Sequence, residues 1–473
     1  MRASRSWSVI AVLALSGVAV ALMQTLVVPL LPLFPGLLDT SVNNVVWLVT
    51  ATLLSGAVCA PVLGRLGDMY GKRRMLLTAL SVMTAGSALG AVSDEFAVVL
   101  VGRVLQGAAL GVIPLGISIM RDLLPEKRVG TGTALMSSTL GIGGAVGLPL
   151  AGLVAQRTSW HWLFAGAALV GLGQIALVRA VVDESPHRSG GRFDFVGVAG
   201  LAAALICLLL PISKGTAWGW TSTPTLGLLA AAAALFAVWG AYELRVPAPL
   251  VNLRVSAGRA VLLTNTASVL TGFAMFATFM VSAQMLQAPV VTGYGFGASL
   301  VLSGVLLLPV GLAMTVFSPV SARISWRRGP RVTLLTGGTV LVVGNLARAF
   351  LHGGVVVAVL GVTVVAIGAA LSYSALPTLI MQAVPPIETA AANSLNTLAR
   401  TIGTSACSAV VAACTSAFTV DVGGAVHPSL TAYTTIFVLA AGAAVCAVLL
   451  ASMIPARPAP VAARLAVPAC AAR

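Results

Sequence analysis

The chain has few charged residues for its length. Asp, Glu, Lys and Arg make up 8% of its 473 residues, whereas a soluble domain carries about a quarter. Hydrophobic residues account for 58%, and water could not solvate the apolar surface that such a chain would expose. The composition therefore excludes a soluble globular protein and indicates one whose solvent is the lipid bilayer.

Acidic residues are scarcer than basic ones, with 12 Asp and Glu against 27 Lys and Arg, and the formal net charge is +15. Such a balance can indicate a nucleic-acid partner. The positions of the cations indicate otherwise, because 22 lie in segments expected on one side of the membrane. Two lie on the other side (Arg157, Lys214), and three lie within apolar runs (Arg103, Arg348, Arg400). This is the positive-inside bias, so we expect a lipid bilayer and no nucleic acid as partner.

Motifs for enzymes and cofactors are missing. The six cysteines include no C-x-x-C pair, and the four histidines include no pair at metal-ligand spacing. Gly293, Gly295 and Gly297 do not have the spacing of a dinucleotide loop, and no other phosphate-binding sequence is found. We therefore expect no metal, no cofactor, no enzymatic activity and no direct use of ATP.

Long apolar runs dominate the chain instead. A helix needs about 20 apolar residues to cross a bilayer. The sequence predicts fourteen such runs. They lie near 8–35, 45–63, 75–93, 96–120, 130–155, 160–182, 194–213, 223–243, 259–286, 298–320, 332–351, 354–381, 390–418 and 431–454. An even number of spans places both termini on one side, and the basic residues at both ends predict that this side is cytoplasmic.

A short basic segment joins the second and third runs. Residues 64–74 read GRLGDMYGKRR. The pattern G-x-L-x-D-x-x-G-[RK]-[RK] resembles the loop between the second and third helices of major facilitator superfamily transporters. The resemblance implies a conformational gate made of Gly64, Arg65, Asp68, Gly71 and Arg74. In this gate Asp68, Arg65 and Arg74 would bond across the cytoplasmic interface between two halves of the protein.

The segment recurs at an offset of 258 residues, which indicates an internal repeat. Pro61, Arg65 and Gly71 return as Pro319, Arg323 and Gly329, whereas Asp68 is replaced by Trp326. Two repeated halves of parallel orientation are typical of this superfamily. We predict an all-α membrane protein with six-helix halves at 1–182 and 256–456. Two inserted helices within 183–255 separate the halves, and 457–473 forms a cytoplasmic tail.

Two further motifs resemble proton-coupled antiporters of the same superfamily. Arg103 and Gln106 belong to an R-x-x-Q-G sequence in the fourth run. A guanidinium there must face the bundle interior or water, or else extend to the outer headgroups. The fifth run carries a glycine-rich helix-packing motif. Its main members are Gly143, Gly147, Pro149 and Gly152. Small residues at this spacing allow close helix packing, in exporters and in other membrane proteins alike.

Together these motifs resemble the fourteen-helix drug:proton antiporter branch, with one departure. That branch carries an aspartate in helix 1 where this chain has Met23, followed by Gln24. All twelve acids lie in expected loops or at helix ends, whereas Arg400 lies well inside the thirteenth run. We expect Gln24, Arg103, Gln106 and Arg400 to line the coupling or substrate pathway and to make the cavity neutral to positive. The alternatives for Arg400 are a cytoplasmic-side pairing with Glu388 or a kinked helix end.

The expected function is secondary active transport by alternating access. The resemblance implies proton-coupled export of amphipathic small molecules, such as drugs or secondary metabolites, as in multidrug efflux and antibiotic resistance. The expected location is a bacterial cytoplasmic (inner) membrane. An uptake or metabolite carrier of the same fold is one alternative, and a non-transporting membrane sensor is another.

Overall fold

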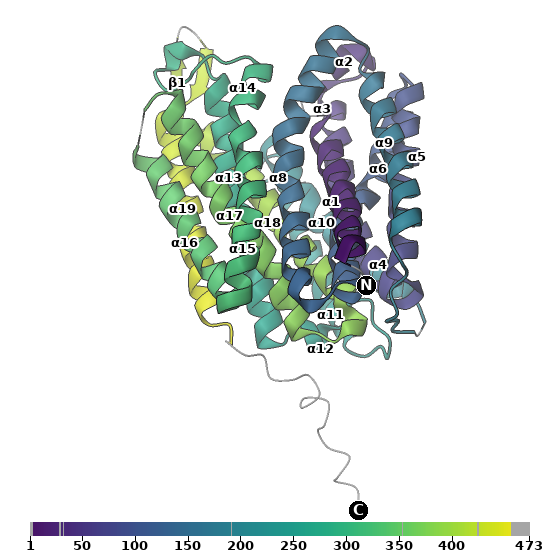
Figure 1. The fold of residues 1–473 in the computed structure, drawn as a ribbon. Helices are drawn as coiled ribbons and strands as arrows, with labels where there is room; N and C mark the ends of the chain where they lie inside the picture. Colours follow the sequence, from purple (N-terminus) through teal and green to yellow (C-terminus); the bar gives the residue numbers. More distant parts are fainter. Residues whose placement is uncertain are drawn as a thin grey trace, which may run out of the picture.

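The structure, a computed structural model, describes residues 3–27, 30–31, 33–190, 192–351, 353–422 and 425–455. Within these residues, fourteen helices are long and apolar enough to cross a membrane, which confirms the predicted all-α membrane fold. Figure 1 shows two bundles of roughly parallel and antiparallel helices standing side by side. The predicted 457–473 tail lies outside the described residues.

The first bundle extends from α1 to α9. Its elements are α1 (Ala3–Thr25), α2 (Phe34–Leu37), α3 (Val42–Val45), α4 (Trp47–Tyr70), α5 (Lys72–Val92), α6 (Phe96–Gln106), the 3₁₀ turn η2 (Gly107–Gly111), α7 (Val112–Leu123), α8 (Glu126–Arg157) and α9 (His161–Val181). Because η2 continues α6 into α7, these three elements form one span. The buried apolar residues of this bundle pack into one large core cluster.

The second bundle extends from α13 to α19. Its elements are α13 (Arg259–Gln287), η3 (Val290–Thr292), α14 (Leu300–Leu306), α15 (Leu308–Arg328), α16 (Pro330–Phe350), α17 (Val355–Ala383), η4 (Pro386–Glu388), α18 (Thr389–Ala417), β1 (Thr419–Val422), β2 (Ala425–Pro428) and α19 (Leu430–Ser452). The two short strands pair antiparallel before α19. Two apolar clusters form the core of this bundle.

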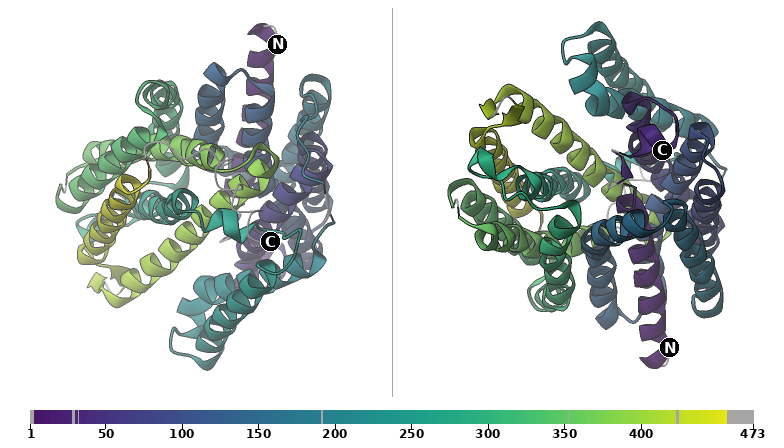
Figure 2. Two further views of the ribbon diagram at one scale, coloured as in Figure 1. Left: turned by 90° about the horizontal axis from the view of Figure 1, so that it is seen from below. Right: turned by 90° about the horizontal axis from the view of Figure 1, so that it is seen from above.

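Between the bundles in sequence lie α10 (Phe195–Trp218), α11 (Thr223–Glu243) and the short α12 (Leu253–Ser256). Helices α10 and α11 pack against each other, and α10 also packs on α4 and α18. Figure 2 shows this pair on the outside of the two bundles. The bundles themselves meet where α8 packs on α15 and α4 packs on α18. The inserted pair therefore covers the α4–α18 contact.

The internal repeat is visible in the backbone. Gly71 separates α4 from α5 with φ 120°, and Gly329 separates α15 from α16 with φ 89°. Both values lie in the region that glycine adopts without a steric penalty. Pro61 and Pro319 lie inside α4 and α15. The end of the bundles that contains Gly71 is called the gate end below, and Figure 1 shows the start of α1 at the same end.

The first span is shorter than predicted. The apolar run suggested 8–35, but α1 ends at Thr25. The described residues that follow form turns and the short helix α2, whose Phe34 is fully buried, with its ring centroid 5.3 Å from that of Trp160 in an edge-to-face arrangement. Leu30 and Phe34 pack against protein, so the length of the apolar run overestimates the helix.

Candidate gate and central cavity

The turn between α4 and α5 contains a single residue outside the helices, Gly71. A side chain there would be strained by the φ of 120°, and its Cβ would lie 2.7 Å from the carboxylate of Glu184. Glu184 instead accepts hydrogen bonds from the backbone N–H groups of Arg73 and Arg74, at 3.0 and 3.3 Å. The turn is thereby attached to the segment that follows α9.

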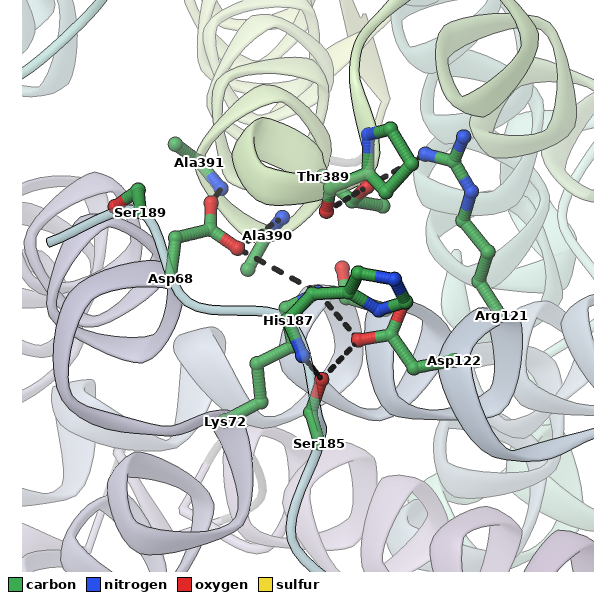
Figure 3. A network of polar contacts seen from close by, with 12 residues as sticks. Asp68, Lys72, Arg121, Asp122, Ser185, His187, Ser189, Thr389, Ala390 and Ala391 are labelled. Atoms are coloured by element: carbon green, nitrogen blue, oxygen red, sulfur yellow. Dashed lines mark hydrogen bonds and ion pairs between the residues drawn. The ribbon is translucent and has the colours of Figure 1, made fainter.

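Asp68, three residues before this turn, joins the two bundles. Its side chain is fully buried, and its two oxygens accept hydrogen bonds from the backbone N–H groups of Ala390 and Ala391 at 3.2 and 2.8 Å. Both N–H groups belong to the first turn of α18, where backbone N–H groups have no partner within the helix. A carboxylate at a helix N-terminus is stabilised by hydrogen bonds and by the helix dipole. Figure 3 shows the aspartate pointing at this helix end.

A second acid and a lysine extend this contact into the first bundle. The Lys72 ammonium lies 3.6 Å from Asp68 and 2.6 Å from Asp122, and the side chains of all three are at most 2% exposed. Asp122 also accepts a short hydrogen bond from Ser185 and lies 3.6 Å from the His187 ring. The buried lysine therefore has two carboxylate partners, which compensates the cost of burying the three charges.

Helices α4 and α18 approach each other very closely beside Asp68. A Cβ at Gly64 would lie 2.8 Å from the carbonyl oxygen of Ala390 and would overlap the Ser394 side chain. Ser394 is fully buried in this contact. No residue larger than glycine fits at position 64 while the two bundles touch, so the predicted gate residues Gly64 and Asp68 both contact the start of α18.

The two predicted gate arginines do not bond across the bundles, which corrects the expectation for Arg65 and Arg74. Arg65 donates to Ser189 at 3.4 Å, and Arg74 lies 4.0 Å from Glu184 with most of its side chain exposed. Both partners belong to the segment after α9, not to the second bundle. The arginine that does cross is Arg121, which donates to the Thr389 hydroxyl at 2.5 Å (Figure 3).

Arg103 and Gln106 form a separate buried cluster inside the first bundle. Arg103 is 2% exposed and donates to the carbonyl oxygens of Leu48 and Met23, at 2.9 and 3.4 Å, and to Gln106 at 2.6 Å. Gln106 in turn donates to Ser87 at 2.9 Å. Carbonyl and amide oxygens therefore satisfy this guanidinium. Neither residue is among those that line the central cavity, so the geometry does not agree with a place on the substrate pathway, while the predicted part in coupling stays a prediction.

A central cavity of about 260 Å³ lies between the bundles. Its lining combines aromatic, hydroxyl and apolar side chains, with no carboxylate among the described residues that line it. The main contributors are Gln24, Thr25, Met275, Phe276, Phe279, Tyr373, Thr397, Arg400, Thr401 and Thr404. Of the predicted pathway residues, Gln24 and Arg400 therefore lie at the cavity.

Arg400 is the one cation of this lining. Its guanidinium lies over the Tyr373 ring, 5.0 Å from the centroid. None of the ion pairs between described residues includes Arg400, so the alternative pairing with Glu388 is wrong for this structure. Glu388 instead accepts a hydrogen bond from Asn252 at 3.0 Å. Arg400 therefore lines the cavity without an acidic partner among the described residues.

The glycine-rich motif of α8 faces helices on both sides. Cβ atoms at Gly143 and Gly147 would overlap Ala21 and Thr25 of α1, and Thr25 donates to the Gly143 carbonyl at 3.1 Å. On the second bundle, Gly304 packs against Pro149, and Gly152 faces Val301. The motif thus brings α8 into close contact with α1 and with the second bundle.

The fold and this site define a multi-pass helical membrane protein whose two bundles enclose a cavity and meet at a buried polar contact around Asp68. The sequence profile of the Major Facilitator Superfamily matches residues 13–408. The chain therefore belongs to the Major Facilitator Superfamily.

Proteins with similar sequences include export and resistance proteins. The chain is 32% identical over 343 residues to the tetracenomycin C resistance and export protein of Streptomyces glaucescens, covering 70% of this chain and 61% of the relative. It is 28% identical over 364 residues to the multidrug resistance protein Stp of Mycobacterium tuberculosis, covering 76% and 66%. The chain thus spans under two thirds of the length of these relatives.

Solved structures share the fold at low sequence identity. The human organic anion transporter MFSD10 aligns with a TM-score of 0.64 and 16% identity, covering 93% of this chain and 99% of that one. The proton:xylose symporter XylE aligns with a TM-score of 0.65 and 12% identity, covering 97% and 98%. These likenesses concern the arrangement of the helices.

Proposed function

We propose that the protein is a secondary active transporter that exports amphipathic small molecules, drugs or secondary metabolites, in exchange for protons. It would act by alternating access in a bacterial cytoplasmic membrane, with both termini and the gate end in the cytoplasm, and would catalyse no chemical reaction. The two halves, 1–182 and 256–456, would rock about the cavity. The export and resistance relatives support the direction and the class of substrate, and the basic residues support the orientation.

The observation that carries the proposal is the Asp68 contact with the first turn of α18. It closes the gate end by joining helices of the two bundles through a small number of polar bonds. Such a contact can be made and broken during a transport cycle, because it is worth a few kcal/mol. In the closed form a substrate in the cavity is cut off from the cytoplasm.

The cavity supports a preference for neutral or anionic amphiphiles over lipophilic dications. Arg400 would repel a cation, and the lining offers no carboxylate to replace the hydration of one. Aromatic and apolar side chains such as Phe276, Phe279 and Met275 would bind the apolar body of the substrate. With Met23 in place of the helix-1 aspartate of the family branch, the transported proton would use Asp39, Asp68, Asp122 or the substrate.

Transport into everted membrane vesicles tests the proposal. We expect a proton gradient, acid inside, to drive uptake of anionic and neutral dyes, and uptake to stop when the gradient is collapsed. Arg400→Gln should lower transport of the anionic dye more than that of the neutral one. Efficient transport of a dication, unaffected by Arg400→Gln, would contradict the proposed substrate class. Vesicles that show no gradient-dependent transport of any compound would contradict the proposed export.

A further inference from the structure

Two buried acids lie together where the inserted helices reach the gate end. Asp194 directly precedes α10, and Glu243 is the last residue of α11. The exposed fractions of these residues are 9% and 2%. Acids are almost never buried to this degree without a partner, so their surroundings must compensate the burial.

One oxygen of each carboxyl group is satisfied by hydrogen bonds. Asp194 Oδ1 accepts from the backbone N–H of Gly197 at 2.7 Å and from the Tyr242 hydroxyl at 2.9 Å. Glu243 Oε2 accepts from the backbone N–H of Val251 at 3.3 Å. These bonds cap α10 and attach the segment after α11 to the pair.

The remaining oxygens, Asp194 Oδ2 and Glu243 Oε1, are buried and have no hydrogen-bond partner among the described residues. Both face the same small space above Gly197. A Cβ at Gly197 would lie 2.4 Å from Asp194 Oδ2 and 2.5 Å from Glu243 Oε1. Two unsatisfied oxygens from different helices therefore converge on one point.

No cation of the described residues pairs with either acid. None of the ion pairs between described residues includes Asp194 or Glu243. The charged and titratable groups of the nearby elements are either exposed or already have an interaction partner. They are Arg192, Arg245 and Arg254 (exposed), Tyr242 (bound to Asp194), Arg65 (bound to Ser189), Asp68 (bound to α18), Glu388 (bound to Asn252), Arg400 (over Tyr373) and Lys214 (over the Trp47 ring). The remaining neighbours belong to an apolar cluster that includes Trp239 and Leu250. The Trp239 ring N–H donates to the Gly197 carbonyl oxygen at 2.8 Å, and it and the Leu250 backbone N–H lie close to the Glu243 carboxyl group without completing a hydrogen bond to Oε1.

An ionised carboxylate can only accept hydrogen bonds. Two ionised groups here would leave two buried charges facing each other without a donor, an arrangement in which one group takes up a proton. A single proton would turn one oxygen into a donor on the side that faces the other. We propose that Asp194 and Glu243 bind one proton between them and form a carboxylic acid–carboxylate pair. The ligand of this site would be a proton from the cytoplasm.

The proton would also act on the gate, a consequence that rests on the proposed function. Val251, bound to Glu243, is followed by Asn252, which donates to Glu388 at 3.0 Å. Glu388 directly precedes α18, whose first turn binds Asp68. Loss of the proton would place two negative charges in one buried space, separate α10 from α11 and displace this connection. The protonated pair therefore favours the closed gate.

Infrared difference spectroscopy on the full-length protein in lipid tests proton binding without any transport. We expect a carboxylic-acid C=O band that is present at acid pH, is lost as the pH is raised and is absent from Glu243→Gln. Asp194→Asn, which retains the helix cap, should remove the same band and serves as a second variant if Glu243→Gln fails to fold. Glu126→Gln, at an exposed acid of the same end, should leave the band unchanged.

The connection to the gate needs a second readout. Ser394→Cys in a cysteine-free background places a thiol in the α4–α18 contact, where it is buried while the gate is closed. We expect its labelling rate to rise several-fold at alkaline pH. This rise should disappear in Glu243→Gln, whose neutral amide can donate to Asp194 as the acid does.

The outcomes separate the two ideas. A band that is missing from the wild type, or that persists in both single variants, overturns the shared proton. A band that sodium ions suppress at constant pH overturns it as well, because the pair would then be a cation site. A normal band with pH-independent labelling keeps the proton site and refutes its action on the gate. Failure of transport alone would contradict only the proposed function.

Discussion

Substitution of Asp68 by asparagine is the sharpest perturbation of the gate. The amide keeps the volume, but it removes the charge that faces the α18 N-terminus and leaves one oxygen for two backbone donors. A hydrogen bond to a charged group contributes about 1.5–3 kcal/mol, and a partly buried charge at a helix end up to about 2 kcal/mol. Lys72 keeps Asp122 at 2.6 Å, so the substitution leaves no unpaired lysine. We estimate a loss of about 3 kcal/mol for the closed form, or about a hundredfold in the equilibrium constant between the closed and open forms.

The Ser394→Cys thiol measures this equilibrium directly. Because Ser394 is buried against Gly64 only while α4 and α18 touch, its labelling rate reports the fraction of open gates. Combining Ser394→Cys with Asp68→Asn should raise the labelling rate by one to two orders of magnitude, since about 1.4 kcal/mol corresponds to a factor of ten. Export in vesicles should fall at the same time, while the protein remains inserted and folded.

Asp183→Asn is the matched control. Asp183 pairs with Arg5 at 2.6 Å, but both side chains are about half exposed, and exposed pairs contribute little. The control should change neither labelling nor transport. If Asp68→Asn labels no faster than the control and transports at the wild-type rate, the carboxylate does not hold the gate and the reasoning from the helix end is wrong.

Three further predictions concern the turn, the cavity and helix 1. Gly71→Ala should destabilise the protein by about 1–3 kcal/mol, measured as a lower thermal unfolding midpoint, because of the strained φ and the contact with Glu184; an unchanged midpoint would contradict this. Arg400→Gln should weaken binding of an anionic dye roughly tenfold in a quenching assay, and equal loss for a neutral dye would exclude a charge effect. Met23→Asp should pair with Arg103 inside the first bundle and leave dication transport unchanged, whereas a gain would mean that residue 23 reaches the cavity.

The sequence predicts the spans well, because a run of apolar residues is a direct consequence of the bilayer. It predicts the end of a span less well where apolar residues continue into buried protein. Leu30 and Phe34 follow α1 in the sequence and are apolar, yet they pack in the first-bundle core outside the helix. Hydropathy cannot distinguish contact with lipid from contact with another helix.

The gate illustrates a second limit. The motif identified Asp68, Gly64 and Gly71, which do meet α18 or form the turn. It did not identify the partners of Arg65 and Arg74, because these lie more than a hundred residues away in a segment without a pattern of its own. Arg121 was missed for the same reason, since its position at a helix end gives no sign that it reaches Thr389 in the second bundle.

A third limit of prediction from the sequence is the rotation of each helix about its own axis. The sequence places Arg103 in a span but does not say which face of the span meets the cavity. Its three hydrogen bonds to Leu48, Met23 and Gln106 turn it into the first bundle. For Asp194 and Glu243 the sequence suggests exposed helix ends, whereas the packing of α10 on α11 buries both. Such facts depend on contacts between helices that are remote in sequence.

The arrangement of charge suggests how the cavity and the gate communicate. The buried acids Asp68, Asp122, Asp194 and Glu243 all lie at the gate end, whereas the charge in the cavity lining is that of Arg400. Helix α18 carries Arg400 and also presents the first turn that Asp68 binds. Ten residues of helix separate the two points, about 15 Å at 1.5 Å per residue. In the proposed cycle, a substrate that pulls on Arg400 and a proton that acts at the gate end would move the same rigid element. Coupling between them would then require no acid in the cavity.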